Sequence, residues 1–222
     1  GLVAPRCFTQ GKNMYKNNFL GFLCAALSAF FFSVPIYAKD SHLVQQQTAA
    51  EPSRVFLQQV SFDSALVKWR DGPDLVWFGS KPDELKLTAN ASFKAHHKIA
   101  TLKGLSPDTR YYYSFKNTAP QATAMSFRTA PTPGNVPEDG NTHIWLLGDS
   151  GTATEGLQGS YHHEGEAIDV MNGFLKYNKE QAGNEPLDML LLLGDNAYLE
   201  GTDEQWQGAF FDIYTDIIQG AA

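Results

Sequence analysis

The sequence predicts an antiparallel β-sandwich followed by the start of an α/β domain. Three observations support this: apolar and polar residues alternate over residues 53–129, prolines and glycines crowd residues 130–141, and from residue 142 the apolar spacing suits helices and buried strands. The 222 residues, 43% of them hydrophobic, suffice for one large domain or two small ones, which excludes disorder throughout. The net charge of −7 argues against a nucleic-acid partner, because phosphate backbones bind basic surfaces.

Residues 1–38 have the pattern of an export signal with a short upstream extension. Met14 is the first methionine, Lys16 supplies a positive charge, and residues 19–34 carry no charge. The run ends at the small residue Ala38, after which we expect cleavage and release into the periplasm or the extracellular space, with no stable membrane span. A retained anchor is the alternative, because the apolar run is just long enough to cross a bilayer.

Cleavage after Ala38 would change the charge and the redox chemistry of the chain. It would remove three basic residues and no acidic one, so 14 bases would face 24 acids and the net charge would be −10. It would also remove Cys7 and Cys24, so the exported part would depend on its core or on a metal rather than on a disulfide. Residues 39–52 would form an N-terminal arm.

Residues 53–129 are expected to form the sandwich. Period-two alternation places one set of apolar residues on the inner faces of successive strands: Ala65, Val67, Trp69, Tyr111, Tyr113, Phe115, Met125 and Phe127. The segment from Leu105 to Tyr111 resembles the tyrosine corner of immunoglobulin-like sandwiches, and the whole region resembles a fibronectin type III domain. We expect Trp69 and the tyrosines to be core residues rather than a sugar-binding face.

Residues 130–141 form a stiff linker, because breakers crowd there and prolines restrict the backbone. Residues 142–222 then read as strand, helix and strand, with parallel strands and a right-handed crossover. The second strand, Leu187–Leu193, is nearly all apolar and is expected to be buried on both faces. A last helix is expected over Trp206–Ile217, with its N-cap at Thr202 or Asp203.

Two strands and two helices cannot close an α/β domain. The chain also starts at Gly1 and stops directly after an apolar-periodic segment. We therefore expect it to be a piece of a longer reading frame, with residues 142–222 forming a truncated domain.

Both of these strands end in Gly-Asp, at Gly148-Asp149 and Gly194-Asp195. In open α/β sheets the working site lies beyond the carboxyl ends of the strands. If the two strands are neighbours, their ends lie about 5 Å apart, and two carboxylates at that distance repel each other. A cation between them is the simplest compensation, although a lone Asp149 would also serve as a helix cap.

The order Gly-Asp-x-Gly and then Gly-Asp-x-x-Tyr resembles the opening of the calcineurin-like metallophosphoesterases, and Tyr198 narrows the resemblance to the purple acid phosphatases. In that family an N-terminal fibronectin-like sandwich is the usual companion. The resemblance implies that Asp149 binds a ferric ion, that Asp195 bridges two metals and that Tyr198 binds iron as a phenolate. It implies a dinuclear centre of Fe(III) with a divalent Fe, Zn or Mn ion, which hydrolyses small phosphate esters by hydroxide attack.

The chain departs from the family pattern after Tyr198. The family continues with Gly-Asn-His-Asp/Glu, a further His, and Gly-His-x-His, and the sequence contains none of these. Only three of the expected seven ligands are present, so we expect this chain alone to be inactive and to bind metal poorly. His162-His163 are expected to be solvated loop residues, and His96-His97 a pair on the face of a strand.

Two other functions fit parts of the sequence. Gly148-Asp149-Ser150 also matches the nucleophile block of Gly-Asp-Ser ester hydrolases, with Ser150 as the nucleophile. Those enzymes need a later Gly-x-Asn-Asp, whereas this chain has Gly194-Asp195-Asn196 in the wrong order. An exported sandwich used for adhesion or carbohydrate binding would need no catalytic residues, but it leaves the two Gly-Asp strand ends unexplained.

Overall fold

The computed structural model describes residues 50–117, 125–151, 166–198 and 200–222. The chain divides into two compact units, 1–45 and 46–222, and every described residue lies in the second. The predicted export signal and the His162-His163 pair lie outside the described residues. Among the described residues, no helix combines the length and the apolar character needed to cross a membrane.

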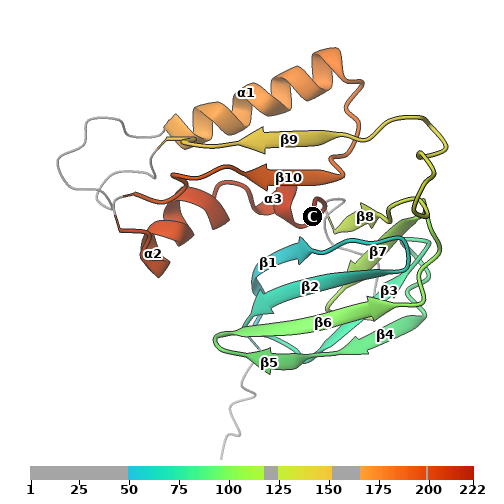
Figure 1. The fold of residues 1–222 in the computed structure, drawn as a ribbon. Coiled ribbons are helices and arrows are strands. Elements are labelled where there is room, and N and C mark those ends of the chain that lie inside the picture. Colours follow the sequence, from blue (N-terminus) through green and yellow to red (C-terminus); the bar gives the residue numbers. More distant parts are fainter. Residues whose placement is uncertain (1–49, 118–124, 152–165, 199) are drawn as a thin grey trace, which may run out of the picture. The chain divides into compact units, whose positions relative to one another are not determined.

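The first part of the chain forms two four-stranded sheets in which every pairing is antiparallel (Figure 1). One sheet has the order β1 (Ser53–Gln58), β2 (Ser64–Arg70), β6 (His97–Lys103), β5 (Ser92–Lys94). The other has the order β4 (Leu87–Asn90), β3 (Leu75–Gly79), β7 (Arg110–Ser114), β8 (Ser126–Arg128). The sequence correctly predicted this part to be antiparallel and rich in strands.

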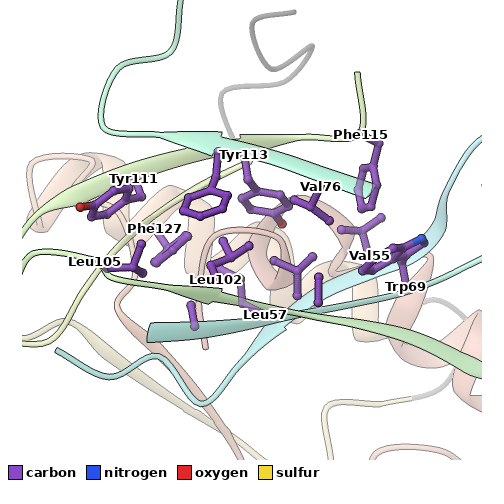
Figure 2. Close-up of a cluster of buried hydrophobic side chains, with 14 residues drawn as sticks. Val55, Leu57, Trp69, Val76, Leu102, Leu105, Tyr111, Tyr113, Phe115 and Phe127 are labelled. Atoms are coloured by element: carbon purple, nitrogen blue, oxygen red, sulfur yellow. The ribbon is translucent and has the colours of Figure 1, made fainter. Parts of the chain in front are cut away.

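Inward-facing side chains of both sheets form one buried cluster (Figure 2). Val67 and Trp69 of β2 and Tyr113 of β7 are fully buried, as the period-two pattern predicted. The ring centroids of Trp69 and Phe115 lie 5.0 Å apart in an edge-to-face arrangement. This arrangement stabilises the fold in addition to the burial of the two apolar rings. The aromatic stripe is therefore core, and it offers no exposed sugar-binding face.

A hydrogen bond from backbone to tyrosine closes the turn before β7. The hydroxyl group of Tyr111 accepts a hydrogen bond from the Ser106 N–H at 2.9 Å, which is the interaction that defines a tyrosine corner. His96, in contrast, is not on a strand face: it lies exposed in the turn between β5 and β6, and only His97 belongs to a strand. The predicted pair is wrong because the hairpin turns at Ala95, whose φ of 54° is left-handed.

The second part of the chain contains two parallel strands and a long helix. β9 (Ile144–Leu147) pairs in register with β10 (Met189–Leu192), and α1 (Glu166–Gln181) lies between them in the sequence (Figure 1). The indole ring of Trp145 stacks on Phe174 of α1, with centroids 4.0 Å apart. The predicted order of strand, helix and parallel strand is confirmed.

The second strand is not buried on both faces as predicted. Helices cover one face, where Trp145 and Leu190 pack against a cluster that includes Tyr214 and Ile218. The opposite face leaves aliphatic side chains between 37% and 67% exposed: Ile144, Leu146, Met189, Leu191 and Leu193. A parallel sheet normally has both faces covered, and within the described parts of the chain no element packs on this second face.

The last predicted helix is divided into three short pieces. These are α2 (Asp203–Trp206), the π-helical turn η1 (Gln207–Phe211) and α3 (Thr215–Ile218). Thr202 is the N-cap, and its capping box with Gln205 is complete, so Asp203 is not the cap. The helix widens because the Asp212 N–H donates to the carbonyl group of Gln207, five residues earlier.

Asp203 instead joins α2 to the sandwich. One of its carboxylate oxygens accepts hydrogen bonds from Arg54 and Arg70, each at 2.7 Å, and the other accepts from the same two guanidinium groups at 3.0 and 2.8 Å. The hydrogen bonds from Arg70 and Arg54 hold the pKa of the Asp203 carboxyl group well below its usual range. A carboxylate that is stabilised in this way favours the folded state as long as it is charged.

Acid should therefore weaken the fold through Asp203. The Asp203 carboxyl group adds its full contribution to the free energy of unfolding when the pH is above its pKa in the unfolded chain, about 3.9. This contribution is lost as the pH falls towards the lower pKa of the same group in the folded state. We expect Asp203→Asn to be less stable than the parent at neutral pH and to lose less stability below about pH 4. Urea denaturation at several pH values measures this, with exposed Asp83→Asn as the control. Parallel pH profiles for the parent and Asp203→Asn would contradict the assignment.

Two further contacts connect the sandwich to the second part of the chain. Arg128 of β8 binds both carboxylate oxygens of Asp188, at 3.1 and 2.9 Å, and also binds Asp139 at 2.6 Å. The buried Tyr113 donates its hydroxyl hydrogen to the carbonyl group of Gln219 at 2.8 Å. These contacts hold the part of the chain that carries the two Gly-Asp turns against the sandwich.

Candidate metal centre

The two Gly-Asp turns lie side by side at the carboxyl ends of β9 and β10. The Asp149 N–H donates to the carbonyl group of Gly194 at 3.1 Å, which continues the pairing of the strands into the turns. A Cβ atom on Gly148 would lie 3.0 Å from the Cβ atom of Leu193, so this close approach favours glycine. Gly194 has a φ of 128°, which side chains rarely adopt.

Both aspartates have the same unusual backbone conformation. The φ angle is 46° at Asp149 and 49° at Asp195, in the left-handed region that costs energy for any residue with a side chain. Both side chains are exposed. The two strand ends therefore turn in the same way.

Tyr198 reaches back to the first of these turns. Its hydroxyl group donates a hydrogen bond of 2.5 Å to a carboxylate oxygen of Asp149, a length typical of a charge-assisted bond. This bond, with desolvation and the charges of Asp149 and Asp195, raises the pKa of Tyr198 to about 12. The structure thus brings all three predicted site residues together, and the phenol is protonated at neutral pH.

Gln205, which was not among the predicted site residues, binds Glu200 and Thr202. The side-chain oxygen of Gln205 accepts hydrogen bonds from the backbone N–H groups of Glu200 and Thr202, both at 3.0 Å. Its amide nitrogen donates to the Glu200 carboxylate at 2.8 Å. The Thr-x-x-Gln spacing of a capping box is the sequence signal for this arrangement.

Two polar residues next to the aspartates are buried, which was not predicted from the sequence. Asn196 is 9% exposed, and its side-chain oxygen has no hydrogen-bond partner within the described residues. Ser150 is 3% exposed and forms a hydrogen bond with Tyr214. Burial raises the pKa of Tyr214 while the bond with Ser150 lowers it, and the phenol also donates to the carbonyl group of Ala167 at 3.2 Å. Ser150 is thus part of the core that attaches α1 to the turn.

The chemistry of these donors suits a hard cation. Asp149 and Asp195 offer carboxylate oxygens and Tyr198 would offer a phenolate oxygen after losing its proton, and trivalent iron is a hard ion that favours such oxygen ligands. Within the described residues, the buried side-chain oxygen of Asn196 near this site has no hydrogen-bond partner. Across the described ranges, no three His, Cys, Asp or Glu side chains lie together as a ligand group. The oxygen set therefore fits part of a metal site and supplies no imidazole.

Neither a protein-family model nor a curated protein matches the chain. Among solved structures, a purple acid phosphatase isolated from yellow lupin (Lupinus luteus) seeds aligns with a TM-score of 0.51 and 17% identity, over 77% of this chain and 34% of that chain. A structure of PhoD aligns with a TM-score of 0.42 and 18% identity, over 69% and 29%. A computationally redesigned β-sandwich protein aligns with a TM-score of 0.27 and 24% identity, over 36% and 95%. The chain thus shares its fold with about a third of a purple acid phosphatase.

Proposed function

We propose that this chain is the N-terminal part of an exported, metal-dependent phosphoric ester hydrolase of the purple acid phosphatase type. The observation that carries the proposal is the convergence of Tyr198 and Asp149, with Asp195 beside them, at the ends of two parallel strands behind a β-sandwich. The fold shared with the lupin enzyme supports it. The fibronectin type III assignment of the sandwich and the metallophosphoesterase assignment of residues 142–222 belong to the same proposal.

The three oxygen ligands have separate roles in this proposal. Asp149 and Tyr198 would hold a ferric ion, and Asp195 would be shared with a divalent Fe, Zn or Mn ion. Such a centre supplies a Lewis acid for the phosphate and a hydroxide nucleophile near neutral pH. Tyr198 would have to release the proton that it now donates to Asp149, so metal binding should release protons. With three of seven expected ligands, this chain alone would be inactive.

The buried position of Ser150 argues against the ester-hydrolase alternative. A nucleophilic serine must reach its substrate and lie within hydrogen-bond distance of a base. Ser150 is 3% exposed, and its described partner is the phenol of Tyr214 rather than a histidine. The strained turn instead presents its exposed side chain at Asp149.

Colour tests the metal proposal directly. The full-length gene product, purified from iron-containing culture, should show a visible charge-transfer band, because a phenolate bound to Fe(III) absorbs in this range. Tyr198→Phe should remove the band and leave the far-ultraviolet circular dichroism unchanged. Tyr177→Phe on the exposed surface of α1 is the matched control and should keep the colour. A colourless, metal-free and active protein that Ser150→Ala inactivates would refute the proposal.

A further inference from the structure

His97 of β6 lies at the junction between the sandwich and the helical segments α2 and η1. Its half-buried ring lines a cavity of about 410 Å³ that is polar on one side and apolar on the other. The polar side includes Arg54, Arg70 and Asp203, and the apolar side includes Phe211 of η1. Histidine is the side chain that ordinarily changes its charge between about pH 5 and 8. A group that can titrate in mild acid is thus part of the contact between two parts of the chain.

Aromatic contacts connect the His97 ring to η1. The ring packs edge-to-face on Phe56 of β1, with centroids 6.2 Å apart, and Phe56 in turn packs on Phe211, with centroids 5.7 Å apart. The guanidinium carbon of Arg54 lies 4.8 Å from the centroid of Phe211, and the ammonium group of Lys68 lies 5.7 Å from that of Phe56. A single aromatic side chain therefore separates His97 from η1, and cations flank this contact.

The charges around His97 are mostly positive. Desolvation and then repulsion by Arg70, Lys68 and Arg54 lower the pKa of His97, while attraction by Asp203 raises it. The Asp203 carboxylate already binds the two arginines, and it is the one anion among these four charged groups. A neutral imidazole fits this cluster, and a protonated one adds a further positive charge to it.

The other side of His97 does not remove this excess of positive charge. His97 also lines a neighbouring surface cavity together with Asp71, Asp74 and Lys98. Lys98 binds Asp74 at 2.7 Å, and the hydroxyl group of Ser53 donates to Asp71 at 2.6 Å. These groups therefore have partners of their own.

We propose that protonation of His97 in mild acid weakens the contact of α2 and η1 with the sandwich, so that this junction acts as a pH-sensitive switch. The sign follows from the lower pKa of His97 in the folded chain. The stabilising contribution of the neutral ring is complete above the unfolded pKa of about 6.5 and is lost as the pH falls through the lower pKa of the folded state. This range lies above the one in which Asp203 loses its charge.

Hydrogen exchange of two backbone amides in the helical segments tests the switch in the full chain. The Trp206 N–H donates to Thr202 and the Asp212 N–H donates to Gln207, both at 2.9 Å. Their protection, corrected for the intrinsic exchange rate, should fall between about pH 7 and pH 5, by at most about tenfold per pH unit for a single proton. The Tyr113 N–H, which donates to Met125 inside the sandwich, should keep its protection.

A matched pair of histidine variants assigns the effect to one ring. His97→Gln cannot take up a proton in this range, so it should abolish the fall in protection at Trp206 and Asp212. His96→Gln changes the adjacent, exposed histidine in the turn and should retain the fall.

A pair of lysine variants tests the electrostatic cause without any measurement of stability. Lys68→Gln removes one of the repelling cations, so the pKa of His97, followed by nuclear magnetic resonance, should rise. Lys103→Gln removes the same charge from the exposed far end of β6 and should leave the titration of His97 unchanged.

An equal fall in protection in His97→Gln and in the parent would overturn the proposal. So would a His97 ring that titrates at or above the ordinary value of about 6.5, or one whose titration is the same in Lys68→Gln and in the parent. None of these measurements requires metal or activity, so their failure leaves the phosphoesterase proposal intact.

Discussion

An Asp195→Asn variant of the full-length gene product is expected to lose its bound metal and its phosphatase activity together. The proposed bridging position gives Asp195 a contact with both ions, and its carboxylate offsets their charge. Asparagine keeps the size of the side chain but removes the negative charge. Because even changes to outer-shell partners of a metal ligand reduce metal affinity about 10–100-fold, loss of this ligand should cost at least about a hundredfold. Metal content by mass spectrometry and hydrolysis of a phosphate monoester measure the two effects.

The control for this variant is Asp169→Asn, in the exposed first turn of α1. It removes the same charge from a side chain that is not among the proposed ligands, and it should keep both metal and activity. Circular dichroism should match for the three proteins, since the Asp195 side chain is exposed. Full metal content in Asp195→Asn would contradict its role as a ligand.

Trp69→Ala is expected to lower the free energy of unfolding by about 3–5 kcal/mol, the range for removal of a buried aromatic side chain. The indole ring is fully buried, stacks edge-to-face on Phe115 and donates its N–H to the carbonyl group of Pro73 at 3.1 Å. The change leaves a cavity and an unpaired carbonyl group. Since whole domains are stable by about 5–15 kcal/mol, this loss is a large fraction of the total. Urea denaturation followed by circular dichroism measures it.

Phe93→Ala is the matched control because this ring, on the edge strand β5, is 69% exposed. Its contact with the Lys98 ammonium group, 5.5 Å from the ring centroid, is a surface interaction, and we expect a change within about 0.5 kcal/mol. If Trp69→Ala does not fold, Tyr113→Phe serves instead: it keeps the core volume and removes the bond to Gln219, at a cost of about 1 kcal/mol. A loss below about 1 kcal/mol for Trp69→Ala would contradict the core assignment.

The sandwich could be predicted because its signals are local. Strand alternation around Val67 and Trp69 and the spacing from Ser106 to Tyr111 depend on residues a few positions apart, and the structure buries or bonds these residues as expected. The parallel pairing of β9 and β10 follows in the same way from a helix of sufficient length between two apolar runs.

Contacts between distant residues could not be predicted. The sequence made Asp203 one of two candidates for a helix N-cap. In the folded chain its carboxylate instead binds Arg54, 149 residues away, and Arg70, 133 residues away. The spacing of apolar residues also does not predict which elements pack on each face of a strand. The run Leu187–Leu193 is apolar enough for burial on both faces, yet helices cover only one face in the described structure.

The candidate site was predictable in its residue types and only partly in its geometry. The Gly-Asp strand ends are enough to predict that Asp149 and Asp195 lie near each other, because parallel neighbours end at the same edge. The bond from Tyr198 to Asp149 depends on left-handed turns that the sequence does not specify. The burial of Ser150 and Asn196 likewise depends on the packing of distant helices.

The contacts across residues 130–141 make the sandwich and the sheet that follows it poor candidates for domain exchange. Arg128 with Asp188, Tyr113 with Gln219, and the arginines of β1 and β2 with Asp203 each join one side to the other. A different sandwich inserted by recombination would have to supply all of these partners in the same places. Evolution of this architecture should therefore preserve the two parts as a pair, and their boundary is a poor position for cutting or fusing genes.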